Sequence, residues 1–324
     1  MTDGKQLILA TKVFAREIRW KSWLYTLSTL FILIGLLTGV FIIEPVWLRI
    51  ACSIGAGLVM VRMFVIYHDH QHHSILNRSV LADIIFKIFG VFMLAPTSIW
   101  KRSHDYHHNH NSKLFSASIG SYPIMTKKKF IQSSPTERRV YLAIRHPLTI
   151  FFGYISMFIF GMCIQSFASC PRRHWDSLLA LIIHFGVSVF IFIYAGWLTW
   201  LLGYVVPFLV AFMLGAYLFY AQHNFPGVTF KEKEEWCYVD AAICSSSYMV
   251  MNPFWKWVTA NIGYHHIHHI NSRIPFYRLP EVMASIPELQ TAKTTTLNPA
   301  DIIACFRLKV WDPESNTMIG VKHL

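Results

Sequence analysis

Charged residues are scarce in this sequence. Only 14% of its 324 residues are Asp, Glu, Lys or Arg, whereas 54% are hydrophobic. A soluble domain usually carries about 25% charged residues. The deficit therefore predicts that lipid, rather than water, surrounds much of the chain.

Acidic residues are the scarcer of the two charged kinds. The chain has 17 Asp and Glu against 29 Lys and Arg, which gives a net charge of +12. A basic chain can bind nucleic acid, but no basic motif interleaved with aromatic residues is present. The Lys and Arg lie between long apolar runs, as the positive-inside bias of a membrane protein predicts. We therefore expect contact with a membrane and no nucleic-acid partner.

Several motifs for soluble redox and metal chemistry are missing. The six Cys form no C-x-x-C pair, so neither a zinc ribbon nor a thioredoxin-like motif is present. The chain also lacks a G-x-G-x-x-G dinucleotide fingerprint and a fused haem motif. Any redox reaction would therefore need electrons from a separate protein.

Long apolar runs account for much of the sequence. A helix needs about 20 such residues to cross a bilayer, and the candidates are residues 23–43, 46–67, 147–167, 178–197 and 200–221. The run 84–95 is shorter and contains Lys87, so we expect a re-entrant or interfacial segment. If one site uses all the histidine clusters described below, 147–221 must cross the membrane an even number of times. We predict a single membrane-embedded domain over 1–324, an all-α integral membrane fold with about four transmembrane helices plus interfacial helices.

Histidine is abundant, and most of the 17 His fall in three short clusters. His68 and His72 are four residues apart at the end of an apolar run, so they share one face of a helix. The other two clusters have the spacing i, i+3, i+4, which also places three imidazoles on one face. They are His104, His107 and His108, and His265, His268 and His269. Asn261 lies one turn before His265 and extends that stripe, and His223 follows the last apolar run directly.

These clusters predict a metal site. A lone histidine near a membrane end is usually a hydrogen-bonding interface residue, and we interpret His146, His174, His184 and His323 in that way. Three helically spaced clusters are hard to explain by packing, because a buried imidazole without a partner is costly. Nine imidazoles exceed the four ligands of a closed zinc site and suit two metals with open positions. The ligand type alone is compatible with Zn, Cu, Fe and Ni.

The order H-x-x-x-H, H-x-x-H-H, H-x-x-H-H resembles the membrane fatty acid desaturase superfamily, and the resemblance covers most of the chain. Residues 68–73 resemble the first histidine box, although His70 stands where a small residue or Cys is common. Residues 100–109 resemble the second box, 222–224 the extra histidine, and 261–269 the third box. Among subfamilies the sequence is most similar to acyl-lipid desaturases of the omega-6 and omega-3 type.

The resemblance implies a di-iron centre that uses O₂ to oxidise an unactivated C–H bond of a lipid acyl chain. The ligand positions it implies are His68, His72, His73, His104, His107, His108, His223, Asn261, His265, His268 and His269. It also implies a separate electron donor, ferredoxin-like or cytochrome b5-like. The histidine boxes are expected on the cytoplasmic side, with the link 169–176 facing outward.

Other functions share parts of this pattern. Related di-iron hydroxylases and carotenoid ketolases have the three boxes, so the reaction itself stays open between forming a double bond and inserting oxygen. A His-rich metal transporter is a third possibility, but its ligands should lie near the bilayer midplane. Here the clusters begin where apolar runs end. We therefore predict an oxygen-dependent di-iron fatty acid desaturase.

Overall fold

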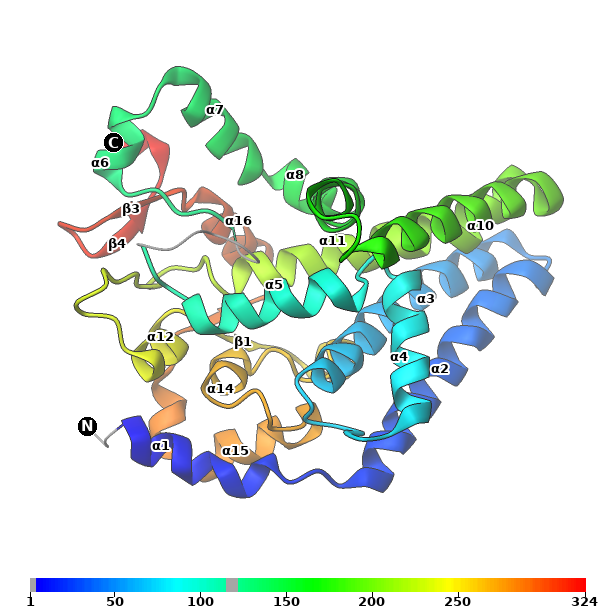
Figure 1. Cartoon of the computed structure of the whole chain (residues 1–324), viewed down its shortest axis with the longest axis horizontal. Helices are drawn as coiled ribbons and strands as arrows, with labels where there is room; N and C mark the ends of the chain where they lie inside the picture. Colours follow the sequence, from blue (N-terminus) through cyan, green and yellow to red (C-terminus); the bar gives the residue numbers. More distant parts are fainter. Residues whose placement is uncertain (1–3, 115–121) are drawn as a thin grey trace.

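The computed structural model describes residues 4–114 and 122–324, which are mostly helical (Figure 1). The longer helices are α2 (Arg19–Ile42), α3 (Val46–Gln71), α4 (Val80–Phe92), α5 (Thr97–His110), α10 (Trp175–Trp200) and α11 (Val206–Ala221). The shorter α-helices are α1 (Gly4–Thr11), α6 (Lys127–Gln132), α7 (Pro135–Ile144), α8 (Pro147–Phe151), α9 (Ser166–Ser169), α12 (Tyr238–Cys244), α13 (Pro253–Val258), α14 (His265–Ile270), α15 (Leu279–Ser285) and α16 (Pro299–Arg307).

The other elements are short, and some are strands. The 3₁₀ helices are η1 (Lys12–Ala15), η4 (Phe276–Arg278), η5 (Pro287–Thr291) and η6 (Val321–His323), and the π-helices are η2 (Tyr154–Gln165) and η3 (Leu201–Val205). The strands are β1 (Tyr248–Val250) paired parallel with β2 (Thr294–Thr296), and β3 (Val310–Asp312) paired antiparallel with β4 (Thr317–Ile319). The chain is mostly helical, as expected, and these short strands are the departure from an all-α fold among the described residues. Three consecutive threonines make β2, and such β-branched residues favour extended backbone.

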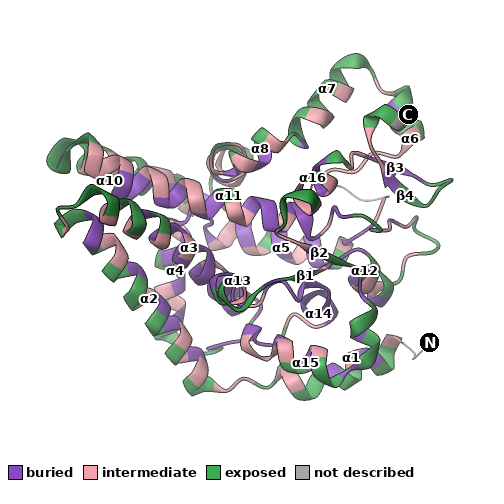
Figure 2. Cartoon of the chain, turned by 180° about the vertical axis from the view of Figure 1, so that it is seen from behind, coloured by how far each residue is buried: buried purple, intermediate pink, exposed green. Residues whose placement is uncertain are grey.

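The helices α2 and α3 form an antiparallel hairpin close to the expected bounds. Its turn contains Glu44 and Pro45, and Pro45 directly precedes the first residue of α3. The outer side of α2 exposes large apolar side chains, among them Phe31 at 79% and Ile42 at 72% (Figure 2). In a soluble protein such a surface would be costly to leave in water, so this face fits contact with lipid.

The chain from 175 to 221 turns back on itself at Gly196. The Trp200 indole N–H donates to Ser188 Oγ at 2.8 Å, and the Tyr204 hydroxyl donates to the His184 carbonyl at 2.6 Å. In a straight helix these pairs would be about 18 and 30 Å apart. Gly196 has φ +79° and ψ 165°, a conformation that is essentially restricted to glycine. The turn lies beside the α2–α3 turn, since Arg49 donates to Thr199 Oγ1 at 2.7 Å.

The expected span 147–167 lies in a segment, 147–169, that is divided into α8, the π-helix η2 and α9. This segment packs against α11, because a Cβ added at Gly153 would meet the Ala216 side chain. Cys163 donates to the Leu94 carbonyl at 3.4 Å, so the segment also contacts the bend between α4 and α5. Its helical part Tyr154–Ser169 is apolar, but it is shorter than the helices that could cross a membrane.

The helices α4 and α5 are bent by 90° relative to each other, which fits the expected re-entrant or interfacial character of 84–95. Ser98, near the start of α5, donates to Asp176 Oδ1 at 2.5 Å and lies 2.8 Å from His174 Nδ1. The link before α10 therefore lies beside the helix that carries the second histidine cluster, and not at the Gly196 end.

By length and composition, three helical segments could cross a membrane, or up to four if the bent pair α4–α5 is one span. The three are Arg19–Ile42, Val46–Gln71 and Trp175–Ala221. The remaining C-terminal segment and the N-terminal residues cover the ends of α3 and α5. Tyr277, for example, accepts a hydrogen bond from the Ile18 N–H at 2.9 Å. This cover buries the histidine clusters.

Candidate metal centre

Four parts of the chain bring nine of the predicted histidines together. The end of α3 supplies His68 and His72, and α5 supplies three more imidazoles on one face. His223 follows α11 directly, and α14 contributes the i, i+3, i+4 triplet that begins at His265. The helical spacing recognised in the sequence is thus present, because each cluster lies on a helix or continues one.

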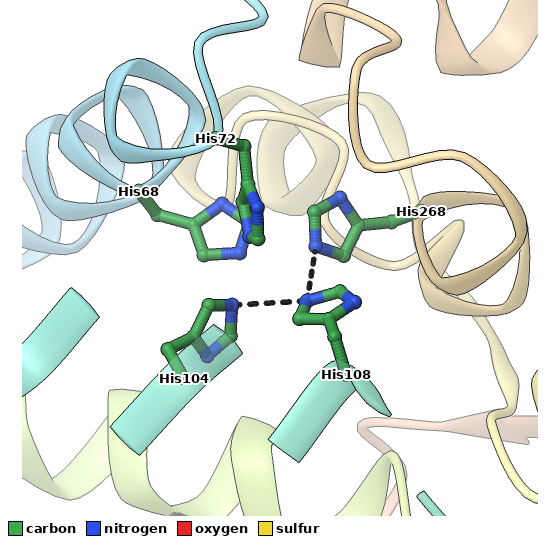
Figure 3. Close-up of side chains that lie close together, drawn as sticks. All are labelled: His68, His72, His104, His108 and His268. Atoms are coloured by element: carbon green, nitrogen blue, oxygen red, sulfur yellow. Dashed lines mark hydrogen bonds between the residues drawn. The ribbon is translucent and has the colours of Figure 1, made fainter. Parts of the chain in front are cut away.

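The nine imidazoles form two groups. In each group, the candidate ligand nitrogens lie within 4.8 Å of one another. Group one is His68, His72, His104, His108 and His268 (Figure 3). Group two is His107, His223, His265 and His269. Both groups draw on α5 and α14, so the two sites are neighbours. The sequence predicted the histidines, but it did not predict this division into five and four.

The nitrogen separations fit transition-metal coordination. In group one, His108 Nε2 lies 3.1 Å from His104 Nε2 and 3.0 Å from His268 Nε2. In group two, His223 Nε2 lies 3.0 Å from His107 Nε2 and 2.8 Å from His265 Nε2. Two imidazole nitrogens bound at right angles to one metal, each about 2.0–2.1 Å from it, would be about 2.9 Å apart. The donor set therefore fits a metal in each group.

Burial favours the neutral form of four of these imidazoles, which is the form that binds metals. It lowers the pKa of His223 to about 4. The pKa values of His265, His268 and His269 lie well below the ordinary value, first because of burial and then because other imidazoles are close. At neutral pH a metal would therefore have no proton to displace from these four ligands.

The nitrogens that face away from the groups are mostly without partners. The Nδ1 atoms of His107, His108, His265 and His268 are buried and have no hydrogen-bond partner in the described part of the chain. Two ligands differ. His223 Nδ1 lies 2.9 Å from the Ser245 carbonyl oxygen, and His68 Nδ1 lies 3.1 Å from Asp69 Oδ1. Asp69 has no recognisable metal-ligand spacing, so sequence reasoning missed its contact.

Two predicted ligand positions lie outside both groups. His73 is exposed and has φ +57° just after α3 ends. Asn261 was expected on the helical stripe of the third cluster, but that prediction was wrong, because α14 begins only at His265. Asn261 has φ +59°, and its amide donates to the Phe276 carbonyl at 3.2 Å. The turn between Val258 and His265 therefore breaks the stripe.

The remaining histidines have local partners. His70 lies outside both groups, and its Nε2 lies 3.2 Å from Asp83 Oδ1. His146, His174 and His184 form hydrogen bonds, as expected of lone histidines. The side chain of His323 lies outside the described part of the structure. None of the histidines in this paragraph whose side chains are described belongs to either group.

Comparison with known proteins agrees with this site. The family model described as "Fatty acid desaturase" matches residues 45–298. A "Fatty acid desaturase" from Bacillus subtilis (strain 168) is 28% identical, over 99% of this chain and 92% of its own. The "Omega-6 fatty acid desaturase, chloroplastic" of Spinacia oleracea is 26% identical, over 77% of this chain and 56% of its own.

A third relative has a more specific name. The "sn-1 acyl-lipid omega-3 desaturase (ferredoxin)" of Nostoc sp. (strain 36) is 26% identical, over 71% of this chain and 65% of its own. The matched region contains all nine grouped histidines, which lie between residues 68 and 269. The chain is an oxidoreductase that belongs to the fatty acid desaturase family.

Proposed function

We propose that this protein is an oxygen-dependent, di-iron desaturase of the membrane that introduces a double bond into an acyl chain linked to a lipid. One observation carries the proposal. In a chain of the desaturase family, five and four imidazole nitrogens converge in two adjacent groups. Neither group contains a carboxylate or thiolate, and both lie where helices end rather than midway along an apolar run. This placement disfavours a metal transporter.

Each group would hold one iron. When bound, the two irons would supply the activation of O₂ and the one-electron chemistry that an unactivated C–H bond requires. The chain's own residues hold the metal-binding nitrogens in place and exclude bulk water. Eight of the nine imidazoles are buried and His223 is half-buried. Water that is kept out cannot divert a reactive centre towards side reactions.

In the proposed reaction, a –CH₂–CH₂– unit of the acyl chain loses two hydrogens and becomes –CH=CH–. The oxidant O₂ takes up these two hydrogens together with two electrons and two protons, and it is reduced to two molecules of water. Two of the electrons must come from outside the chain. We propose a ferredoxin-like or cytochrome b5-like donor, and the name of the Nostoc relative indicates ferredoxin for that protein. Basic residues near the site would steer an acidic donor.

We also propose a topology of four crossings. α2 and α3 would cross once each, and the two arms of 175–221 would cross on either side of Gly196, while 147–169 would stay on the histidine side. The bonds between Ser98 and Asp176 support this, because they link the start of α10 to α5. The link 169–176 would then face the histidine side, not outward as the sequence suggested. Arg172 and Arg173 would join the other basic residues there, in better agreement with the positive-inside rule.

The reaction can be tested by expressing the protein together with a suitable electron donor and analysing the host's lipids by mass spectrometry. We expect acyl chains lighter by two hydrogens, with the double bond at one defined position. A His268→Ala variant should insert into the membrane and produce none. Products heavier by one oxygen would show that the protein is a hydroxylase and not a desaturase. They would still be compatible with the proposed metal centre.

A further inference from the structure

Group one and group two differ in the hydrogen-bond partners of the imidazole nitrogens that face away from the metal. A metal-binding imidazole uses one nitrogen for the metal, and its other N–H usually donates to a carboxylate, a carbonyl or water, which fixes the tautomer and the ring orientation. Group two has a carbonyl in this position, that of Ser245 behind His223. Group one has a carboxylate, Asp69 behind His68. In the described part of the chain, no other grouped histidine is paired with a carboxylate.

Both oxygens of Asp69 are engaged. Oδ1 lies 3.1 Å from His68 Nδ1, and Oδ2 accepts the Phe276 backbone N–H at 2.7 Å. The side chain is 1% exposed, so neither contact competes with water. Phe276 lies in η4, which also contacts the N-terminal segment through Tyr277. Asp69 is therefore held from two sides and presents a fixed acceptor to the imidazole.

The charge of this carboxylate lacks a conventional partner. Among the described residues, no Lys or Arg forms an ion pair with Asp69, and its only pairing is with His68. A buried carboxylate is costly unless it is paired and hydrogen-bonded. When His68 Nδ1–H donates to the carboxylate, Nε2 keeps its lone pair and can bind a metal. A cation bound there would also stabilise the buried carboxylate.

We propose that Asp69 is a positioning residue that supports the metal of group one through His68 and makes the two metal sites unequal. It holds His68 in the tautomer with Nε2 free and places a negative charge behind the ligand of a cation. Group two has only a neutral carbonyl in the equivalent place. This inference rests on the proposed di-iron function, and it predicts that loss of the carboxylate weakens one site and spares the other.

The test is an anaerobic titration of the metal-free, full-length protein with Fe(II), read as iron bound per chain. In Asp69→Asn, the amide NH₂ can face His68 Nδ1 and favour the tautomer with a proton on Nε2. We expect one of the two sites to bind iron about 10–100-fold more weakly and the other to be unchanged. Mössbauer spectra with ⁵⁷Fe should then lose one of two distinct signals. Asp69→Ser, which removes the charge and leaves room for water, should weaken the same site.

Asp83→Asn is the matched control. Asp83 Oδ1 lies 3.2 Å from His70 Nε2, so it forms the same kind of pair on a histidine outside both groups. This variant should bind iron like the wild type. Unchanged iron binding in both Asp69 variants would overturn the proposal, as would equal weakening of both sites together with a lower melting temperature of the metal-free protein. A wild-type chain that binds fewer than two irons would refute the di-iron proposal as well.

Discussion

The turn at Gly196 makes the proposed topology testable through stability. The residue has φ +79° and ψ 165°, and a Cβ added there would meet no atom within 4 Å. A Gly196→Ala variant would therefore suffer backbone strain without a steric clash. Such a conformation costs a non-glycine residue about 1–3 kcal/mol. We expect Gly196→Ala to be destabilised by that amount relative to the wild type.

Gly186→Ala is the matched control for this variant. Gly186 lies in the same helix, is also exposed, and likewise has no atom within 4 Å of an added Cβ, but it has no positive φ. Replacing a helical glycine by alanine stabilises by about 0.5–1 kcal/mol. The two alanine variants should therefore move the thermal unfolding midpoint in opposite directions in the same detergent. A Gly196→Ala protein as stable as the wild type would refute the turn at this residue.

Three further predictions follow from the site and the topology. Asn261→Gly keeps the positive φ but removes the amide that donates to Phe276, so we expect lower stability with unchanged iron content; loss of iron would show that the amide serves the metal. A membrane-impermeant thiol reagent should label the exposed residues Cys170, Cys237 and Cys244 from the same side of sealed vesicles; labelling of Cys170 from the opposite side would contradict four crossings. The metal-free protein should lose stability as the pH falls from about 6.5 towards 4, at up to about 1.4 kcal/mol per pH unit for each buried histidine. The sign follows from His223, whose folded pKa of about 4 lies below its unfolded value, so that the unfolded chain takes up the proton first; a flat melting temperature between pH 7.5 and 5 would contradict this reasoning.

Periodic features of the sequence predicted the structure well. The α2–α3 hairpin lies close to the apolar runs 23–43 and 46–67, because a bilayer-length run leaves few alternatives to a helix. The nine grouped histidines were all identified. For eight of them the helical spacing fixes which imidazoles share a face, whereas His223 was identified by its place directly after an apolar run.

Features that depend on contacts between distant segments were not predictable in the same way. The segment 147–169 is divided into three helical elements where it contacts α11 and the Leu94 carbonyl, and these contacts are with residues far away in the sequence. The start of α14 at His265 follows from the turn that contains Asn261, whereas spacing alone suggested a continuous helix. The support of His68 by Asp69 involves neighbours in sequence, but the Phe276 N–H that helps hold the carboxylate comes from far along the chain.

The iron content of the purified, full-length protein shows whether the two histidine groups hold two irons. We predict about two irons per chain in the wild type, about one or fewer in His268→Ala, which removes a ligand of group one, and about two in His146→Ala. His146 is an exposed residue outside both groups whose imidazole caps the short helix α8. One iron or none per wild-type chain, zinc in place of iron, or an unchanged iron content in His268→Ala would contradict the account.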